Sequence, residues 1–284
     1  MSSVHVNKVE FGGKTLIDLT DDTVTPGTLI KGATAHAADG SRITGETEAA
    51  LVFDNAGSHN SIYRGKSLGT AVTTAQYQAI SAGTFQDLYI GDYWTIGGVN
   101  YRIAAFDYFY QTGDTACTKH HAVVVPDTNL YDSVMNSTNT TAGGYLGSAM
   151  YQSNLAKAKT TIKAAFSGHI VSYREYLTNT VTNGVPTSGA WTDSEADLMT
   201  EQMVYGSGIF SPVSDGSTIP ANFRVSNAQL PLFAFDHAMA ANQQNYWLRD
   251  VVSAANFAYV SFAGNARYAR ASASLGVRPA FCIG

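Results

Sequence analysis

Charged residues are scarce in this chain. Aspartate, glutamate, lysine and arginine make up 14% of its 284 residues, well below the share in an average soluble protein, and the net charge is −5. No basic stripe interrupts this mildly acidic background, so we expect no nucleic acid as a partner. The hydrophobic content of 45% is nevertheless high enough for a packed core, which argues against a disordered chain.

Long hydrophobic runs are also missing. No segment approaches the roughly 20 consecutive apolar residues that a membrane-spanning helix needs. The first ten residues, MSSVHVNKVE, lack the apolar core of a secretion signal. We therefore expect no membrane insertion, and we expect synthesis in the cytoplasm of the producing cell without export by a standard leader.

Cysteine is nearly absent. Cys117 and Cys282 stand far apart in the sequence, and they could pair, but their spacing does not establish a disulfide. His36 with Asp39 offers one histidine and one acid, which is far short of a closed metal site.

The other candidates for a metal site are equally weak. The run Asp193–Asp197 lacks the spacing of a calcium-binding EF-hand loop. His120 and His121 precede a predicted strand, whose alternation would send the two rings to opposite faces, so we expect both to be structural. We predict no metal and no cofactor.

Catalytic motifs are missing as well. The sequence has no Gly-x-Ser-x-Gly elbow, no glycine-rich phosphate loop and no His-Glu-x-x-His. No spacing pairs its acids and histidines convincingly. We predict that the protein is not an enzyme.

The residues that are present predict a mixed α+β protein with many turns. Helices are expected over residues 72–82 and 150–168, because apolar residues recur at helical spacing and a glycine ends the second segment. Residues 85–109 predict a β-hairpin that turns at Gly97–Gly98. Residues 122–126 predict a short buried strand.

The region from 184 to 205 is harder to assign. We expect a loop over residues 184–197, with Trp191 inside it. Acidic residues are favoured at helix N-termini, so the acids of this loop predict a helix over Glu195–Tyr205. An irregular loop is expected over residues 210–222.

The last forty or so residues have an unusual composition. Between residues 257 and 274 alanine recurs at almost every second or third place, and the residues between mix aromatics, arginine and small polar types without a consistent apolar face. Aromatics supply contact area and Ser and Asn supply adaptable hydrogen bonds, so this composition is typical of a ligand-contact surface. An ordinary exposed loop is the plainer alternative. The predicted ligand-binding residues are Asn256, Tyr259, Ser261, Phe262, Asn265, Arg267, Tyr268, Arg270 and Leu275.

Trp247-Leu-Arg-Asp250, the alanine-spaced patch and Gly276-Val-Arg-Pro-Ala-Phe281 resemble the C-terminal end of a C-type-lectin-like domain family. That family is common in tail proteins of phages of gut bacteria. Some members resemble the variable proteins of diversity-generating retroelements, in which a mutated repeat rewrites asparagine codons. The resemblance implies a variable-type region at about 246–284. In this interpretation Trp247, Arg249, Arg278 and Phe281 are scaffold residues that hold the patch rigidly.

Two relatives of that fold have activities that this sequence does not support. Calcium-dependent sugar-binding lectins use a Glu-Pro-Asn or Gln-Pro-Asp triplet with a Trp-Asn-Asp strand, and neither occurs here. Sulfatase-activating oxidases share the Gly-x-Arg ending, which Gly276-Val-Arg278 matches. They work through two nearby cysteines near that end, whereas only Cys282 lies there.

Residues 1–48 form a separate, threonine-rich segment with too little apolar material for a core of its own. Its landmarks are Leu-Thr-x-Asp-Thr-Val, Leu-x-x-Gly-x-Thr-Ala-His and Asp-Gly-x-x-Ile-Thr-Gly. They resemble a small module that recurs in phage tail and fibre proteins. The resemblance implies a tail-attachment or trimerising module that a neighbouring protein or another protomer completes.

These observations predict an α+β protein in two parts. Residues 1–48 would be a small β-rich attachment module, and residues 49–284 a C-type-lectin-like ligand-binding domain. The expected function is non-catalytic receptor binding at the tip of a phage tail, by a virion-borne homotrimer. Its partners would be a bacterial surface receptor, protein or glycan, and other tail proteins. The alternatives are a structural tail or baseplate component without host contact and, less favoured, an enzyme acting on surface glycans.

Overall fold

The computed structural model describes residues 4–47, 54–216, 218–219 and 228–284. The chain divides into two compact units, Met1–Phe53 and Asp54–Gly284, and each is described by itself. The predicted boundary after residue 48 lies outside the described residues. No helix among the described residues combines the length and the apolar character needed to cross a membrane.

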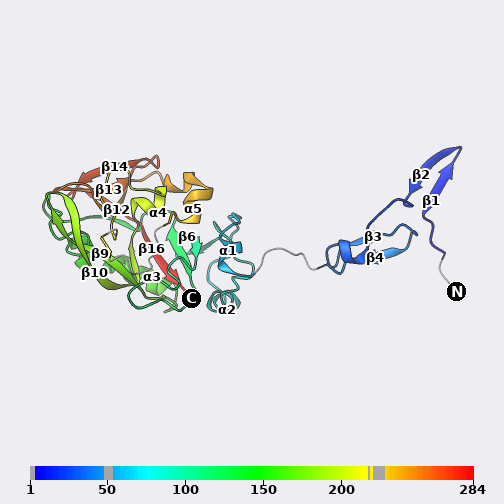
Figure 1. Cartoon of the computed structure of the whole chain (residues 1–284), viewed down its shortest axis with the longest axis horizontal. Helices are drawn as coiled ribbons and strands as arrows, with labels where there is room; N and C mark the ends of the chain where they lie inside the picture. The colour runs from blue at the N-terminus through cyan, green and yellow to red at the C-terminus, as the bar shows by residue number, and fades with distance from the viewer. Residues whose placement is uncertain (1–3, 48–53, 217, 220–227) are drawn as a thin grey trace. The chain divides into compact units, whose positions relative to one another are not determined.

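The N-terminal unit consists of two separate two-stranded antiparallel sheets (Figure 1). Strand β1 (Lys8–Phe11) pairs with β2 (Lys14–Asp18), and β3 (Thr34–His36) pairs with β4 (Arg42–Thr44). A 3-10 turn, η1 (Pro26–Thr28), lies between them. Gly45 is the one buried residue in the described part of this unit, so its strands enclose no apolar core.

The C-terminal unit contains two five-stranded sheets and a two-stranded ribbon, with short helices around them (Figure 1). The first sheet has the order β11-β16-β7-β6-β5, and the second has the order β14-β13-β12-β15-β8. The strands of the first sheet are β5 (Tyr93–Ile96), β6 (Val99–Phe106), β7 (Ala122–Pro126), β11 (Ala196–Leu198) and β16 (Pro279–Ile283). Those of the second are β8 (Tyr131–Val134), β12 (Tyr246–Val251), β13 (Asn256–Val260), β14 (Ala266–Arg270) and β15 (Ser274–Val277).

The helices are short, and the longest two were predicted. The α2 helix (Thr74–Ser81) starts with a capping box, in which Thr73 and Gln76 exchange side-chain and backbone hydrogen bonds. The segment 150–168 forms a π-helical turn, η2 (Met150–Asn154), followed by α3 (Ala156–Ala165). The remaining helices are α1 (Ala56–His59), α4 (Glu201–Tyr205), α5 (Pro231–Phe235) and the 3-10 turn η3 (His237–Ala240).

The coarse prediction of an α+β protein is confirmed, as are the hairpin that turns at Gly97–Gly98 and the strand over 122–126. The prediction of a loop over 184–197 was wrong. This segment belongs to β10 (Val185–Ser194), which pairs with β9 (Tyr173–Thr182) in a long ribbon. Asn183 and Gly184 both have positive φ, at 52° and 79°, which matches the two-residue hairpin turns that favour Asn-Gly.

The prediction of a helix over Glu195–Tyr205 was wrong in its first half. Residues 196–198 form β11, which pairs with the C-terminal strand β16. The helix α4 begins only after Thr200, whose side chain accepts a hydrogen bond from the backbone N–H of Met203. An N-cap threonine therefore sets the start of the helix, and the acids upstream do not.

The predicted scaffold residues lie in the interior. Trp247 and Phe281 are fully buried, and Arg249 and Arg278 nearly so. The Arg278 guanidinium donates to the carbonyls of Pro126 and Met239, at 2.7 and 3.0 Å. Trp247 donates through its indole N–H to the carbonyl of Ser133, at 2.9 Å, which ties the second sheet together across β15.

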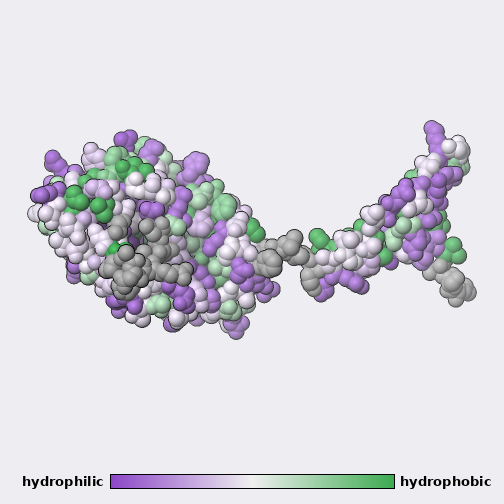
Figure 2. Space-filling model, viewed as in Figure 1, coloured by the Kyte–Doolittle hydropathy of each residue, from purple (hydrophilic) through white to green (hydrophobic). Residues whose placement is uncertain are grey.

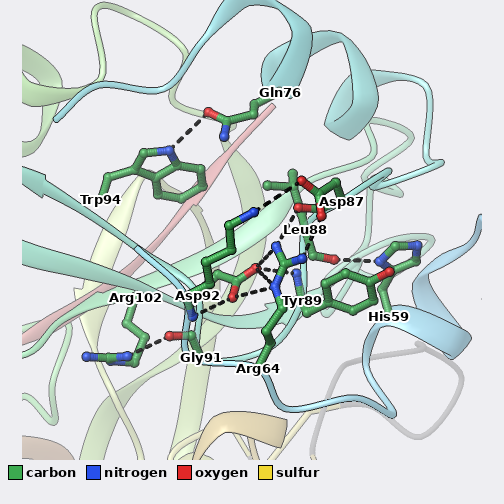
Figure 3. Close-up of polar contacts among 11 residues, drawn as sticks. His59, Arg64, Gln76, Asp87, Leu88, Tyr89, Gly91, Asp92, Trp94 and Arg102 are labelled. Carbon is green, nitrogen blue, oxygen red and sulfur yellow. Dashed lines mark hydrogen bonds and ion pairs between the residues drawn. The ribbon is translucent and has the colours of Figure 1, made fainter. Parts of the chain in front are cut away.

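A charged cluster near the start of the C-terminal unit is also structural (Figure 3). Arg64 reaches between Asp87 and the buried Asp92, with N–O distances of 2.5 and 2.6 Å. Asp92 also accepts backbone N–H groups of Lys66 and Tyr89. Because its oxygens are all satisfied within the chain, Asp92 anchors the first segments of the unit.

Candidate functional site

The predicted ligand-binding residues lie mainly on one hairpin, β13–β14, at the edge of the second sheet. Side chains alternate between the two faces of a strand, and the register shows how they divide. Asn256 lies opposite Arg270 and Ala258 opposite Tyr268, on one face. Tyr259 lies opposite Arg267, on the other. The structure therefore splits the predicted surface, and Arg267 does not share a face with Tyr268.

Five of the nine predicted residues are exposed, and the rest are buried to different degrees. Asn256, Tyr259 and Leu275 are half-buried, and Ser261 is buried. The exposed residues are Phe262, Asn265, Arg267, Tyr268 and Arg270.

Three of these residues contribute to packing. Tyr259 lies edge-on to Trp247, with ring centroids 6.3 Å apart, and Leu275 packs against the same interior cluster. The Ser261 hydroxyl accepts a hydrogen bond from the backbone N–H of Asn265, at 3.1 Å. Ser261 therefore shapes the turn of the hairpin and presents little surface to a ligand, contrary to its predicted role.

A loop that sequence reasoning did not include extends this surface. Ile209 and Phe210 follow α4, and their side chains are 50% and 39% exposed. The Phe210 ring packs edge-on against the Tyr268 ring, with centroids 5.2 Å apart. Tyr268, Arg270, Ile209 and Phe210 are called the aromatic patch below. Apolar residues gather on the surface over β13 and β14 in Figure 2.

A buried carboxylate holds this loop in place. Glu201 is fully buried, and its carboxylate accepts backbone N–H groups from Ile209, Phe210 and Ser211, at 2.9 to 3.2 Å, and the Ser211 hydroxyl at 2.8 Å. Hydrogen bonds to an ionised acceptor are stronger than those between neutral groups. The aromatic patch therefore rests on a loop with a fixed backbone.

Further buried charges lie behind Glu201. Asp250 accepts the backbone N–H groups of Glu201 and Asp215, at 2.6 and 2.9 Å. Arg249 forms ion pairs with Glu175 and with Asp215, the latter at 2.9 Å. Burial raises the pKa of Asp250 to about 7, and it also raises the pKa of Asp215. This network links β12, β9 and the loop after α4 beneath the patch.

The charge on the hairpin is positive and uncompensated. Arg267 and Arg270 are exposed, and no acidic side chain among the described residues lies within 4 Å of either guanidinium. Both arginines therefore retain free donors for a ligand. An edge strand with exposed arginines is also protected from pairing with another strand.

The other candidate sites have structural partners. The His120 ring lies 2.7 Å from an Asp107 oxygen, and the His121 ring accepts the backbone N–H of Phe109. Cys117 and Cys282 are buried free thiols. Within the described residues no group of three or more His, Cys, Asp or Glu side chains is arranged to hold a metal ion.

Comparison with known families gives one match. A family described as a domain of unknown function, DUF6273, matches residues 213–284, which include strands β12 to β16. No curated protein and no solved structure matches the chain. The matched segment contains the whole β13–β14 hairpin, so the hairpin is part of a recurring unit.

Proposed function

We propose that this chain is a receptor-binding protein of a phage tail tip, and that the aromatic patch and the hairpin around it contact the host. The observation that carries the proposal is the pairing of an exposed contact surface with a rigid support. Tyr268 is 52% exposed beside the unpaired Arg270, while Glu201 and Asp250 fix the backbone behind them. Aromatic and arginine side chains on a rigid base are typical of binding hot spots.

The C-terminal unit has a C-type-lectin-like fold in this proposal. The burial of Trp247, Arg249 and Arg278 at the motif positions supports it, as do the two sheets that meet at the C-terminal strands. On that scaffold the exposed positions of the β13–β14 hairpin can vary without loss of the core, whereas Phe257 and Val260 belong to the core.

The N-terminal unit attaches the protein to the tail and holds a homotrimer together. Phe11, Leu16 and Ile30 are each more than half exposed, although strands normally bury one apolar face. A unit of this size without a core is not expected to fold alone, so other chains would cover these side chains. Light scattering on the full chain should give three copies, and Phe11→Ser with Leu16→Ser should lower that number.

Adsorption assays test the binding function directly. The purified full chain should block attachment of the phage to its host, and the double variant Tyr268→Ala/Arg270→Ala should lose at least about tenfold in blocking potency. The matched control is Ile62→Ala/Lys119→Ala, which removes an apolar and a basic side chain from exposed positions outside the hairpin. It should block as the native protein does.

Three other results would count against the proposal. Failure of the native protein to block adsorption would favour a structural tail component without host contact. Release of reducing ends from host polysaccharide by the native protein would favour an enzyme. Equal loss of blocking in both double variants would show that the aromatic patch is not the contact surface.

A further inference from the structure

A hollow of about 510 Å³ lies beside the tip of the β13–β14 hairpin. It is enclosed by the end of α4, by η3 and by the turn that joins the two strands. Residues that line it include Tyr205, Gln229, His237, Ala241, Gly264 and Asn265. Its volume falls within the range of small-molecule sites.

The shape of the hollow follows from small residues and one fixed hydrogen bond. Gly264 has a φ of +83°, and an added Cβ would stand 3.2 Å from Ala241, so the turn packs closely against the segment after η3. The Tyr205 hydroxyl donates to the Gly264 carbonyl at 3.0 Å, which ties α4 to the turn. The walls are therefore preformed, and alanine and glycine supply five of the ten described lining residues.

Three polar side chains line this space with unused hydrogen-bonding groups. Gln229 donates through its amide to the Val204 carbonyl at 2.8 Å, and its amide oxygen has no partner within the described residues. The His237 ring and the Asn265 side-chain amide likewise have no hydrogen-bond partner in the described part of the chain. Donors and acceptors are thus available together at one site.

Among the residues that the structure describes, the lining contains no acidic residue, lysine or arginine. A charged ligand would find no aspartate, glutamate, lysine or arginine side chain among these residues to compensate its desolvation. A ligand with several hydroxyl groups and an apolar face would use both the amides and the alanine walls. The exposed ring of Phe262, on the same turn, adds an aromatic surface nearby.

We propose that this hollow binds one neutral sugar unit of a host surface glycan. The inference rests on the proposed receptor-binding function and deepens it, because it names the ligand class and a site at the tip of the same hairpin. The arginines of the hairpin would then contact more distant parts of the receptor, while the hollow holds a single uncharged ring.

Saturation-transfer NMR on the full chain tests this proposal. The probes are glucose, galactose and N-acetylglucosamine, with glucuronic acid and a neutral tripeptide for comparison. At least one neutral sugar should give transfer signals. Ala263→Leu, which adds bulk at a lining position of the hollow, should weaken binding by at least about tenfold. Asn265→Ala, which removes one hydrogen-bonding group, should weaken it by about three- to tenfold. Ala116→Leu, at an exposed alanine outside the hollow, should leave binding unchanged.

Binding of none of the neutral sugars would overturn the inference, as would stronger binding of glucuronic acid or the tripeptide. Sugar binding that survives Ala263→Leu would place the site elsewhere and would also overturn it. Adsorption assays separate this failure from failure of the proposed function. A native protein that blocks adsorption but binds no neutral sugar keeps its receptor-binding function and loses the hollow as the site. A protein that binds sugar in the hollow but does not block adsorption loses the receptor-binding function.

Discussion

The ring of Phe210 meets the ring of Tyr268 edge-on, with centroids 5.2 Å apart, although the two residues belong to distant segments of the chain. One lies in the loop after α4, and the other lies in the edge strand β14. Edge-on aromatic pairs contribute about 0.5–1.5 kcal/mol beyond simple burial. The contact joins a loop held by Glu201 to a hairpin held by Trp247, so both halves of the aromatic patch depend on buried anchors.

Removal of the Glu201 carboxylate should release the loop. Glu201→Ala leaves three backbone N–H groups and the Ser211 hydroxyl without their charged acceptor. We expect the free energy of unfolding to fall by at least about 2 kcal/mol, measured by urea denaturation. The loop should also become sensitive to limited proteolysis after Ile209.

Glu195→Ala is the control for that experiment. Glu195 pairs with Lys163 at 2.7 Å on the surface, and both side chains are substantially exposed. Surface ion pairs contribute little, so this variant should lose less than about 1 kcal/mol. If the two variants lost the same stability, Glu201 would not be the anchor of the loop.

The buried acids predict that stability falls as the pH rises above about 4. Burial raises the pKa of Asp250 to about 7 and that of Asp197 to about 6, from near 4 in the unfolded chain. Between about pH 4 and these raised pKa values the folded state binds more protons than the unfolded state. The stability that the protonated carboxyl groups contribute is therefore fully present below about pH 4. It is lost as the pH rises through 6 and 7.

Between pH 6 and 7 Asp250 should dominate this effect. The free energy of unfolding should fall there by up to about 1.4 kcal/mol, as measured by denaturation at each pH. Asp250→Asn should flatten the curve in this interval, because an amide has no proton to lose. The control Asp132→Asn, at an exposed strand position, should keep the native slope. A native curve that is flat between pH 6 and 7 would contradict the assignment to Asp250.

The stability of the β9–β10 ribbon should depend on the turn glycine, Gly184. Gly184 has a φ of +79°, and a Cβ there would approach the backbone nitrogen of Ala254 at 2.7 Å. Gly184→Ala should therefore combine left-handed strain, about 1–2 kcal/mol, with a clash against the segment that leads into β13. Gly98→Ala is the control, because Gly98 has a similar φ of +82° and a Cβ placed there would meet no atom within 4 Å. Urea denaturation should show the larger loss for Gly184→Ala, and equal losses would exclude the clash.

Local signals in the sequence predicted part of this fold. Gly97–Gly98 identified the β5–β6 hairpin because two strand-like runs flank it. Asn183–Gly184 carries an equally good turn signal, but the polar residues that follow it in β10 conceal the strand. The ribbon lies at the surface, where the sequence of a strand need not alternate clearly.

The candidate site, like the fold, was predicted from the sequence only in part. The composition of the hairpin predicted that Arg267, Tyr268 and Arg270 would reach solvent, which they do. That composition alone did not separate Arg267 from Tyr268, which point to opposite faces because they are neighbours in one strand, β14. The role of Glu201 could not be predicted either. A buried carboxylate that accepts hydrogen bonds and a surface acid at the start of a helix look alike in sequence.

The glycine of the Gly276-Val-Arg278 motif has a steric explanation that can be tested. A Cβ at Gly276 would lie 1.7 Å from the side-chain nitrogen of Asn129. That nitrogen donates to the Asn245 carbonyl at 3.0 Å, and the Asn129 oxygen accepts from Asn242 at 2.9 Å. Gly276→Ala must displace this bridge, which joins the segment before β8 to the segment before β12, and this should cost about 3 kcal/mol of unfolding free energy.

A double-mutant cycle separates this clash from a general effect of the extra methyl group. Asn129→Ala alone should cost about 1–3 kcal/mol through its lost hydrogen bonds. In the double variant the space left by Asn129 accommodates the new methyl group, so the total loss should be smaller than the sum by about 2 kcal/mol. Urea denaturation of the four proteins gives this coupling energy. Additive losses would mean that Gly276 is required for some reason other than the approach of Asn129.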